Sequence, residues 1–131
     1  MKINLPWPPK ELSPNARVHW SKRSKAAKTY RHSCFLHVRS AQIRDLLESH
    51  ACSQPYPDHG RLHLWIDFYP PDRRHRDDDN LIAAFKSGRD GIADALDIND
   101  KRFICHPCIQ DQLGKPDGYV EVTITTGATR G

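Results

Sequence analysis

The segment RLHLWIDFY, residues 61–69, decides the fold because its side chains alternate between apolar and polar. All of its even-numbered positions are large and apolar, whereas its odd-numbered positions include His63, Trp65 and Asp67. A period of two residues is typical of a β-strand with one buried face. Two prolines follow at once, and proline cannot continue a sheet ladder, so we expect the strand to end there.

Flanking segments predict the remaining elements. Residues 2–5 and 119–126 also alternate and predict two more strands. Residues 21–48 contain neither proline nor glycine and repeat apolar side chains at helical spacing, which predicts a long helix. A second helix is expected after the acidic residues 77–79, with two glycines weakening its middle. The apolar positions are Ala27, Tyr30, Cys34, Val38, Ile43 and Leu47 in the first helix, and Leu81, Phe85, Ile92 and Leu96 in the second.

The order of these elements predicts an α+β fold in which two main helices pack on a small mixed β-sheet. The chain has 131 residues, enough for one hydrophobic core, so we expect residues 1–131 to form a single domain. Hydrophobic residues make up 37% and charged residues 27% of the sequence, which is typical of soluble globular proteins.

The sequence also predicts a cytoplasmic protein that does not enter a membrane. No apolar run approaches the about 20 residues that a membrane-spanning helix needs. Residues 1–9 are rich in proline and lack the apolar core of a signal peptide. Cys34 and Cys52 are isolated and Cys105 and Cys108 form a CxxC pair, so we expect thiols rather than a disulfide framework.

Charge is distributed unevenly along the chain. Residues 1–40 carry nine of the 20 Lys and Arg residues but one of the 16 acidic residues. A basic segment combined with an acidic remainder suggests a polyanionic partner bound near a carboxylate-rich site, although a solvated helix face would give the same composition. The basic residues of the first predicted helix are Lys22, Arg23, Lys25, Lys28 and Arg31.

The acidic run at residues 77–79 is the candidate active site. In an extended segment, Asp77 and Asp79 would project to the same side, so both carboxylates could reach one ion. Asp100 follows the second helix and could join them at the same edge of the sheet. Clustered carboxylates of this kind hold Mg²⁺ beside a phosphate. The alternative is that the run only caps the helix, and Asp78 is then the best candidate for a capping or solvated residue.

Basic residues next to the acidic run favour a phosphate site over a simple cap. Arg73, Arg74 and Arg76 immediately precede the acids, and arginines hold phosphate while aspartates hold a metal. Lys86 lies seven residues after Asp79, hence two turns along one helix face, where it could stabilise charge that develops on the phosphate.

Three segments together resemble the RusA family of Holliday junction resolvases. They are the N-terminal LPWPP at residues 5–9, the central DRRHRDDDNL at residues 72–81, and Asp94-Ala95-Leu96 followed by Asn99-Asp100.

This resemblance implies a homodimeric, Mg²⁺-dependent endodeoxyribonuclease that resolves four-way DNA junctions by paired nicks with 5′-phosphate and 3′-hydroxyl ends. Mn²⁺ is a candidate substitute for Mg²⁺. The family's metal ligands correspond to Asp77, Asp79 and Asp100. The family also has a functional lysine, but its usual position is Ala83 here, so Lys86 becomes the nearest candidate. The basic residues named above would hold the DNA.

The sequence leaves two other DNA-related functions open and gives little support for a zinc site. The chain could bind junctions or duplex DNA without cutting it, or it could cut branched DNA more broadly. A zinc site at Cys105 and Cys108 lacks a second ligand pair at suitable spacing. No glycine-rich phosphate loop occurs, so no nucleotide cofactor is expected.

Overall fold

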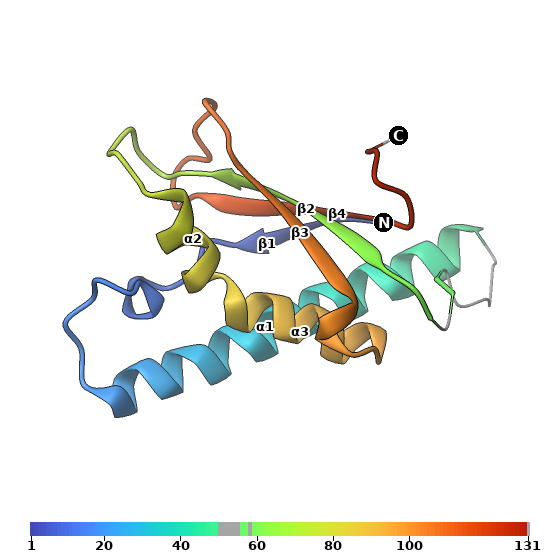
Figure 1. Cartoon of the computed structure of the whole chain (residues 1–131), viewed down its shortest axis with the longest axis horizontal. Helices are drawn as coiled ribbons and strands as arrows, with labels where there is room; N and C mark the ends of the chain where they lie inside the picture. The colour runs from blue at the N-terminus through green and yellow to red at the C-terminus, as the bar shows by residue number, and fades with distance from the viewer. Residues whose placement is uncertain (50–55, 58, 131) are drawn as a thin grey trace.

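The computed structural model describes residues 1–49, 56–57 and 59–130 and shows a mixed α+β fold (Figure 1). Its strands and helices share one hydrophobic core. In chain order the elements are β1 (Lys2–Pro6), η1 (Lys10–Leu12), α1 (Trp20–Ser49), β2 (Leu62–Tyr69), α2 (Asp78–Ala84), α3 (Lys86–Leu96), η2 (Asp100–Arg102), β3 (Phe103–Ile109) and β4 (Tyr119–Thr125), where η marks a 3-10 helix.

The four strands form one mixed sheet in the order β1-β4-β2-β3. β4 pairs antiparallel with both β1 and β2, whereas β2 pairs parallel with β3. The parallel pair requires a crossover, and the chain makes it through α2 and α3, which lie with α1 on one face of the sheet (Figure 1). The predicted fold class is therefore confirmed.

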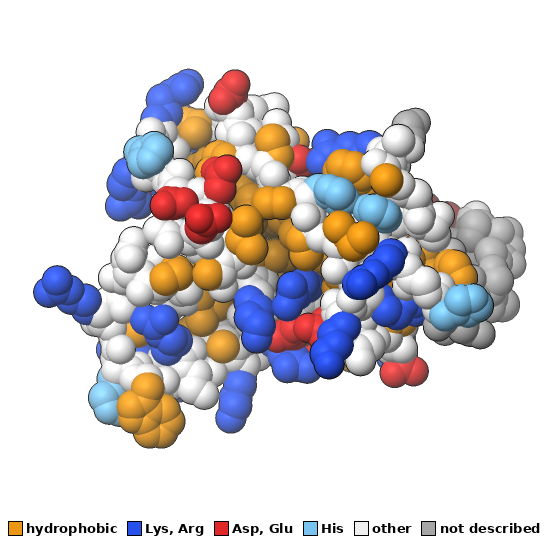
Figure 2. Space-filling model, in the orientation of Figure 1, with side chains coloured by type: hydrophobic (Ala, Val, Ile, Leu, Met, Phe, Trp, Pro, Cys, Tyr) orange, Lys and Arg blue, Asp and Glu red, His pale blue; other side chains and the backbone are white. Residues whose placement is uncertain are grey.

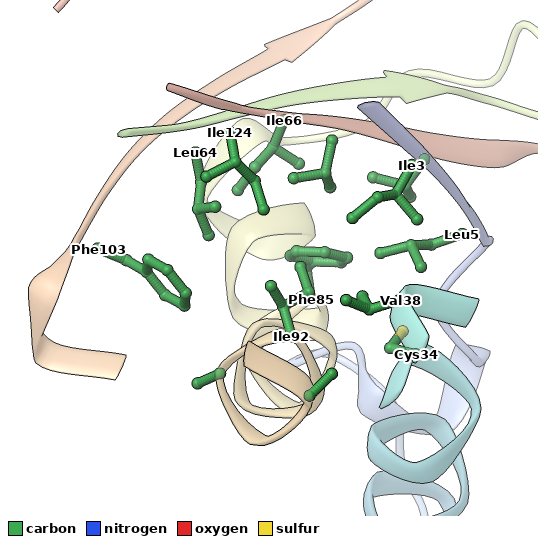
Figure 3. Packing of buried hydrophobic residues seen from close by; sticks show 14 of the residues in the cluster. Ile3, Leu5, Cys34, Val38, Leu64, Ile66, Phe85, Ile92, Phe103 and Ile124 are labelled. Carbon is green, nitrogen blue, oxygen red and sulfur yellow. The ribbon is translucent and has the colours of Figure 1, made fainter. Parts of the chain in front are cut away.

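The core fills the space between this sheet face and the helices. The alternation predicted for β2 is confirmed because its even-numbered residues 62–68 are at most 2% exposed. Figure 3 shows Ile3, Leu64 and Ile124 pointing from the sheet toward Val38 of α1 and Ile92 of α3. Alternating strands and facing helices thus bury one continuous apolar layer.

Gly88 and Gly91, the two glycines expected to weaken the second helix, are both buried in its contacts with α1. A Cβ atom added at Gly91 would overlap the backbone carbonyl of Arg31 and lie 3.1 Å from the Cβ of Cys34. The missing side chain lets the backbones of α1 and α3 approach closely. The packing therefore compensates for the low helix propensity of glycine.

The far end of α1 departs from the predicted apolar stripe. Val38 is fully buried, but Ile43 is 58% and Leu47 is 70% exposed. Their helical spacing correctly predicted the helix, but the apolar side chains at these two positions are not buried. The reason is visible in Figure 1, where the last turns of α1 extend beyond the part of the sheet that the helix covers.

β3 is a strand that the sequence pattern did not predict. It contains Pro107, which removes a backbone donor, and it lies at the edge of the sheet, where proline is tolerated. Cys105 and Cys108 belong to this strand and are free thiols, as is the buried Cys34, whereas Cys52 lies outside the described residues. None of the described helices is long and apolar enough to cross a membrane.

The sheet face opposite the helices carries an ion pair in which the carboxylate is buried and the arginine is partly exposed. Asp67 of β2 is only 2% exposed although it belongs to the polar face of its strand. Nη2 of Arg130 lies 2.7 Å from each of its carboxylate oxygens, and Gln110 donates a further hydrogen bond at 2.8 Å. The C-terminal segment is thereby fixed to this face of the sheet.

Candidate functional site

The acidic run forms the beginning of α2. Asp77 is the N-cap, with an extended backbone, and its Oδ1 accepts a hydrogen bond from the backbone N–H of Asp79 at 3.0 Å. Asp78 and Asp79 are in the first helical turn. Asp77 rather than Asp78 is the capping residue, and Asp78 is solvent-exposed, which is the other role that the sequence offered for it. The extended conformation assumed up to Asp79 was wrong. Asp77 and Asp79 are joined by this capping hydrogen bond rather than by alternation along an extended strand.

The three carboxylates are exposed and make no ion pair with any residue in the described part of the chain. The preceding arginines pair elsewhere, since Arg74 and Arg76 lie 3.5 and 2.9 Å from carboxylate oxygens of Asp72. Negative charge therefore accumulates at the start of α2, where the positive end of the helix dipole partly stabilises it.

Arg76 differs from the other two arginines because it is turned inward. Its side chain is only 13% exposed, and its guanidinium lies 5.5 Å from the ring centre of Trp7. Hydrogen bonds from the backbone N–H of Arg74 and from the Arg76 side chain lower the pKa of Asp72. Arg76 thus orders the segment before the acids, while Arg73 and Arg74 remain exposed.

Asp100 stands at the start of η2, beyond α3, and its Oδ2 lies 3.4 Å from Nη2 of Arg89. Among the described residues, no three His, Cys, Asp or Glu side chains form a group that could hold a metal ion. The structure therefore brings Asp77 and Asp79 together but keeps Asp100 beside Arg89.

Lys86 does not share a helix with Asp79. α2 ends at Ala84, Phe85 forms its C-cap, and Lys86 is the first residue of α3. The prediction that Lys86 lies two turns along one helix face was wrong. Phe85, the residue at the break, is 2% exposed and packs in the core.

The break creates a recess of about 150 Å³ between α2, α3 and the sheet. Lys86, Arg89 and Cys105 are among the residues that line it, but most of the lining surface is apolar. In Figure 2 acidic side chains gather where α2 begins, next to an apolar hollow, and basic side chains gather over the start of α3. The apolar part of the wall consists of Ile66, Ile82, Ala83 and Phe85.

Some basic side chains in the first half of α1 make hydrogen bonds within the protein, and others are exposed to solvent. Arg23 donates a hydrogen bond to the carbonyl of Ala16 at 2.8 Å. Arg31 reaches α3 and donates to both carboxylate oxygens of Asp94, at 2.6 and 2.8 Å, which lowers the pKa of that carboxyl group. The exposed lysines on this half of the helix are Lys22, Lys25 and Lys28.

The two cysteines of the CxxC pair in β3 do not face one shared binding site. Cys105 lines the recess, whereas Cys108 is exposed and is paired in register with Asp67. Residues three apart in a strand point to opposite faces of the sheet, so the two thiols diverge. This geometry explains why the two cysteines form no ligand pair.

These features define a small α+β protein with an exposed acidic helix start beside a recess that has basic residues in its wall. No protein-family model matches the chain. An uncharacterized protein of Xylella fastidiosa (strain Temecula1) is 51% identical over 123 residues, which cover 94% of this chain and 74% of that protein. The chain belongs to the same family as this protein.

Proposed function

We propose that the chain is a metal-dependent endonuclease that resolves four-way DNA junctions, as its resemblance to the RusA family implies. One observation carries the proposal beyond that resemblance. Ala83, which stands where the family has its functional lysine, and Lys86 line the same recess. Lys86 therefore borders the same space as position 83, next to the helix that begins with the acidic run.

The carboxylates at the start of α2 have the chemistry that Mg²⁺ requires. Mg²⁺ prefers oxygen ligands and is commonly held by one or two carboxylates together with substrate phosphates and water. Asp77 and Asp79 are adjacent and exposed, so they would hold the ion, and Mn²⁺ could replace it. We propose Asp100 as a third ligand, although here it is paired with Arg89. The bound ion would supply an activated water and stabilise charge on the phosphate.

The remaining residues would bind and orient DNA. Lys86 would stabilise negative charge on the phosphate that reacts, and Lys22, Lys25 and Lys28 would contact the backbone of a junction arm. Two copies of the chain would place one site on each of two opposing strands, as the two-fold symmetry of a junction requires. We expect sedimentation of the purified chain to show a dimer.

Cleavage of an end-labelled four-way junction in Mg²⁺ tests the proposal. We expect Asp79→Asn to slow single-turnover cleavage by about 100-fold or more, because metal catalysis contributes several kcal/mol. Asp78→Asn is the matched control, since it removes an equal charge from the neighbouring position. Linear duplex and flap substrates separate a junction-selective enzyme from a broader nuclease. Binding without nicking at any Mg²⁺ or Mn²⁺ concentration would favour the non-catalytic DNA-binding alternative.

The role of Lys86 can be tested by moving the lysine within the recess. We expect Lys86→Ala to reduce the rate of cleavage and the double variant Ala83→Lys/Lys86→Ala to restore part of it, because both positions line the same space. Thermal unfolding of both variants controls for loss of folding. If Lys86→Ala cuts at the wild-type rate, the role assigned to this lysine is wrong.

A further inference from the structure

Arg89 is held less tightly than two other arginines of this protein, Arg31 and Arg130. Its contact with Asp100 is 3.4 Å, whereas the ion pairs Arg31–Asp94 and Arg130–Asp67 have contacts of 2.6 and 2.7 Å. Charge-assisted hydrogen bonds between nitrogen and carboxylate oxygen are usually about 2.7–2.9 Å long. Asp100 therefore only partly satisfies the guanidinium of Arg89.

The Nε atom of Arg89 is buried and has no hydrogen-bond partner in the part of the chain that the structure describes. An unsatisfied buried donor is unfavourable, more so when the group is charged. The side chain as a whole is 29% exposed and lines the recess, so an anion that enters the recess can reach it. An anion there would compensate the positive charge that the 3.4 Å contact with Asp100 leaves only partly paired.

Two features of the recess favour a phosphate group of DNA as this anion. The planar guanidinium presents parallel donors that match two oxygens of one phosphate. Lys86, a second basic residue, also lines the recess. The apolar part of the wall, which includes Ile66 and Ile82, can also cover the sugar or base attached to that phosphate.

We infer that the recess is a phosphate-binding subsite for the DNA backbone, with Arg89 as its deep ligand and Lys86 as its second cation. The inference rests on the proposed function because it takes DNA as the ligand. It adds Arg89 to the residues that bind the substrate. Binding of the phosphate by Arg89 requires no metal ion.

Cys105 offers a local probe of the recess because its thiol lies in the wall. In a Cys52→Ser/Cys108→Ser background, the other remaining thiol is Cys34, which is fully buried. We would measure alkylation by N-ethylmaleimide in EDTA, with and without a four-way junction. At ten times the dissociation constant the junction should slow alkylation about tenfold, because about one-tenth of the sites stay free.

The salt dependence of junction binding in EDTA tests Arg89 itself. Arg89→Gln should lower the slope of log affinity against log salt by about 0.9, the contribution of one phosphate contact. Arg89→Lys keeps the charge and should therefore bind more weakly with the wild-type slope. Arg44→Gln, an exposed arginine near the other end of α1, is the matched control and should change neither quantity.

The outcomes separate this inference from the proposed nuclease function. Nicking of junctions without protection of Cys105, or an Arg89→Gln variant with an unchanged slope, would overturn the phosphate subsite alone. Protection and a reduced slope without nicking would support the subsite and overturn the nuclease. If Arg89→Gln fails to fold, unchanged affinity of Arg89→Lys would overturn the inference, and weaker binding with the wild-type slope would support it.

Discussion

Replacement of Gly91 by alanine should destabilise the protein although alanine is the better helix former. The gain in helix propensity is about 1 kcal/mol. Against it, the new Cβ would overlap the carbonyl oxygen of Arg31, a backbone atom that cannot rotate away, and would crowd Cys34. Overpacking of a core contact costs about 1–3 kcal/mol, and a backbone clash belongs at the upper end of this range. We therefore expect a net loss of about 2 kcal/mol in the free energy of unfolding.

Urea denaturation followed by far-UV circular dichroism measures this change. The midpoint should fall while the slope m stays constant, because the surface exposed on unfolding is nearly the same. Gly127→Ala is the matched control, since a Cβ at that position meets no atom within 4 Å. A Gly91→Ala variant as stable as the wild type would refute the close approach of α1 and α3 at this residue.

Three further predictions concern caps and ion pairs. Asp77→Ala should lower the free energy of unfolding by about 1 kcal/mol, whereas Asp77→Asn should retain it because asparagine also caps helices; urea denaturation distinguishes them. Arg31→Gln should destabilise the protein at pH 7 but lose its effect in acid. The reason is that the pKa of Asp94 is lowered in the folded state. The stabilisation by the Arg31–Asp94 pair is therefore present above the pKa that Asp94 has in the unfolded chain, and it disappears as the pH falls through the pKa that Asp94 has in the folded protein. A pH series of unfolding midpoints tests this, and equal effects at all pH values would contradict it. Arg130→Ala should lower the free energy of unfolding by about 1–3 kcal/mol, because the buried carboxylate of Asp67 then keeps only the hydrogen bond from Gln110. A urea midpoint equal to that of Arg44→Ala would contradict this expectation.

Much of the fold follows from local sequence patterns. The alternation in β1, β2 and β4 predicted these strands because one face of each is buried, and burial imposes a period of two. β3 could not be found in this way. Its burial pattern does not alternate regularly, and Pro107 argues against a strand unless its edge position is known. That position is set by tertiary pairing with β2.

The same division applies to the candidate site. The acidic run and its basic neighbours were identified from the sequence because charge and spacing are local properties. The inward turn of Arg76 onto Trp7 could not be predicted, since these residues are far apart in the chain. Arg89 was also missed as a candidate, because its partly satisfied guanidinium is defined by Asp100 and by the depth of the recess.

The helix break at Phe85 connects the core with the proposed chemistry. The Phe85 ring packs edge-on against Phe68 of β2 and Tyr30 of α1, with ring centres 6.0 and 6.3 Å apart. A Cβ at Gly88 would meet both Phe85 and Tyr30 at 2.8 Å, so this glycine leaves room for the two rings. Lys86 follows Phe85 directly, so the packing of these rings positions the start of α3, where Lys86 lines the recess. The placement of the proposed functional lysine therefore depends on core packing rather than on its spacing from the acidic run.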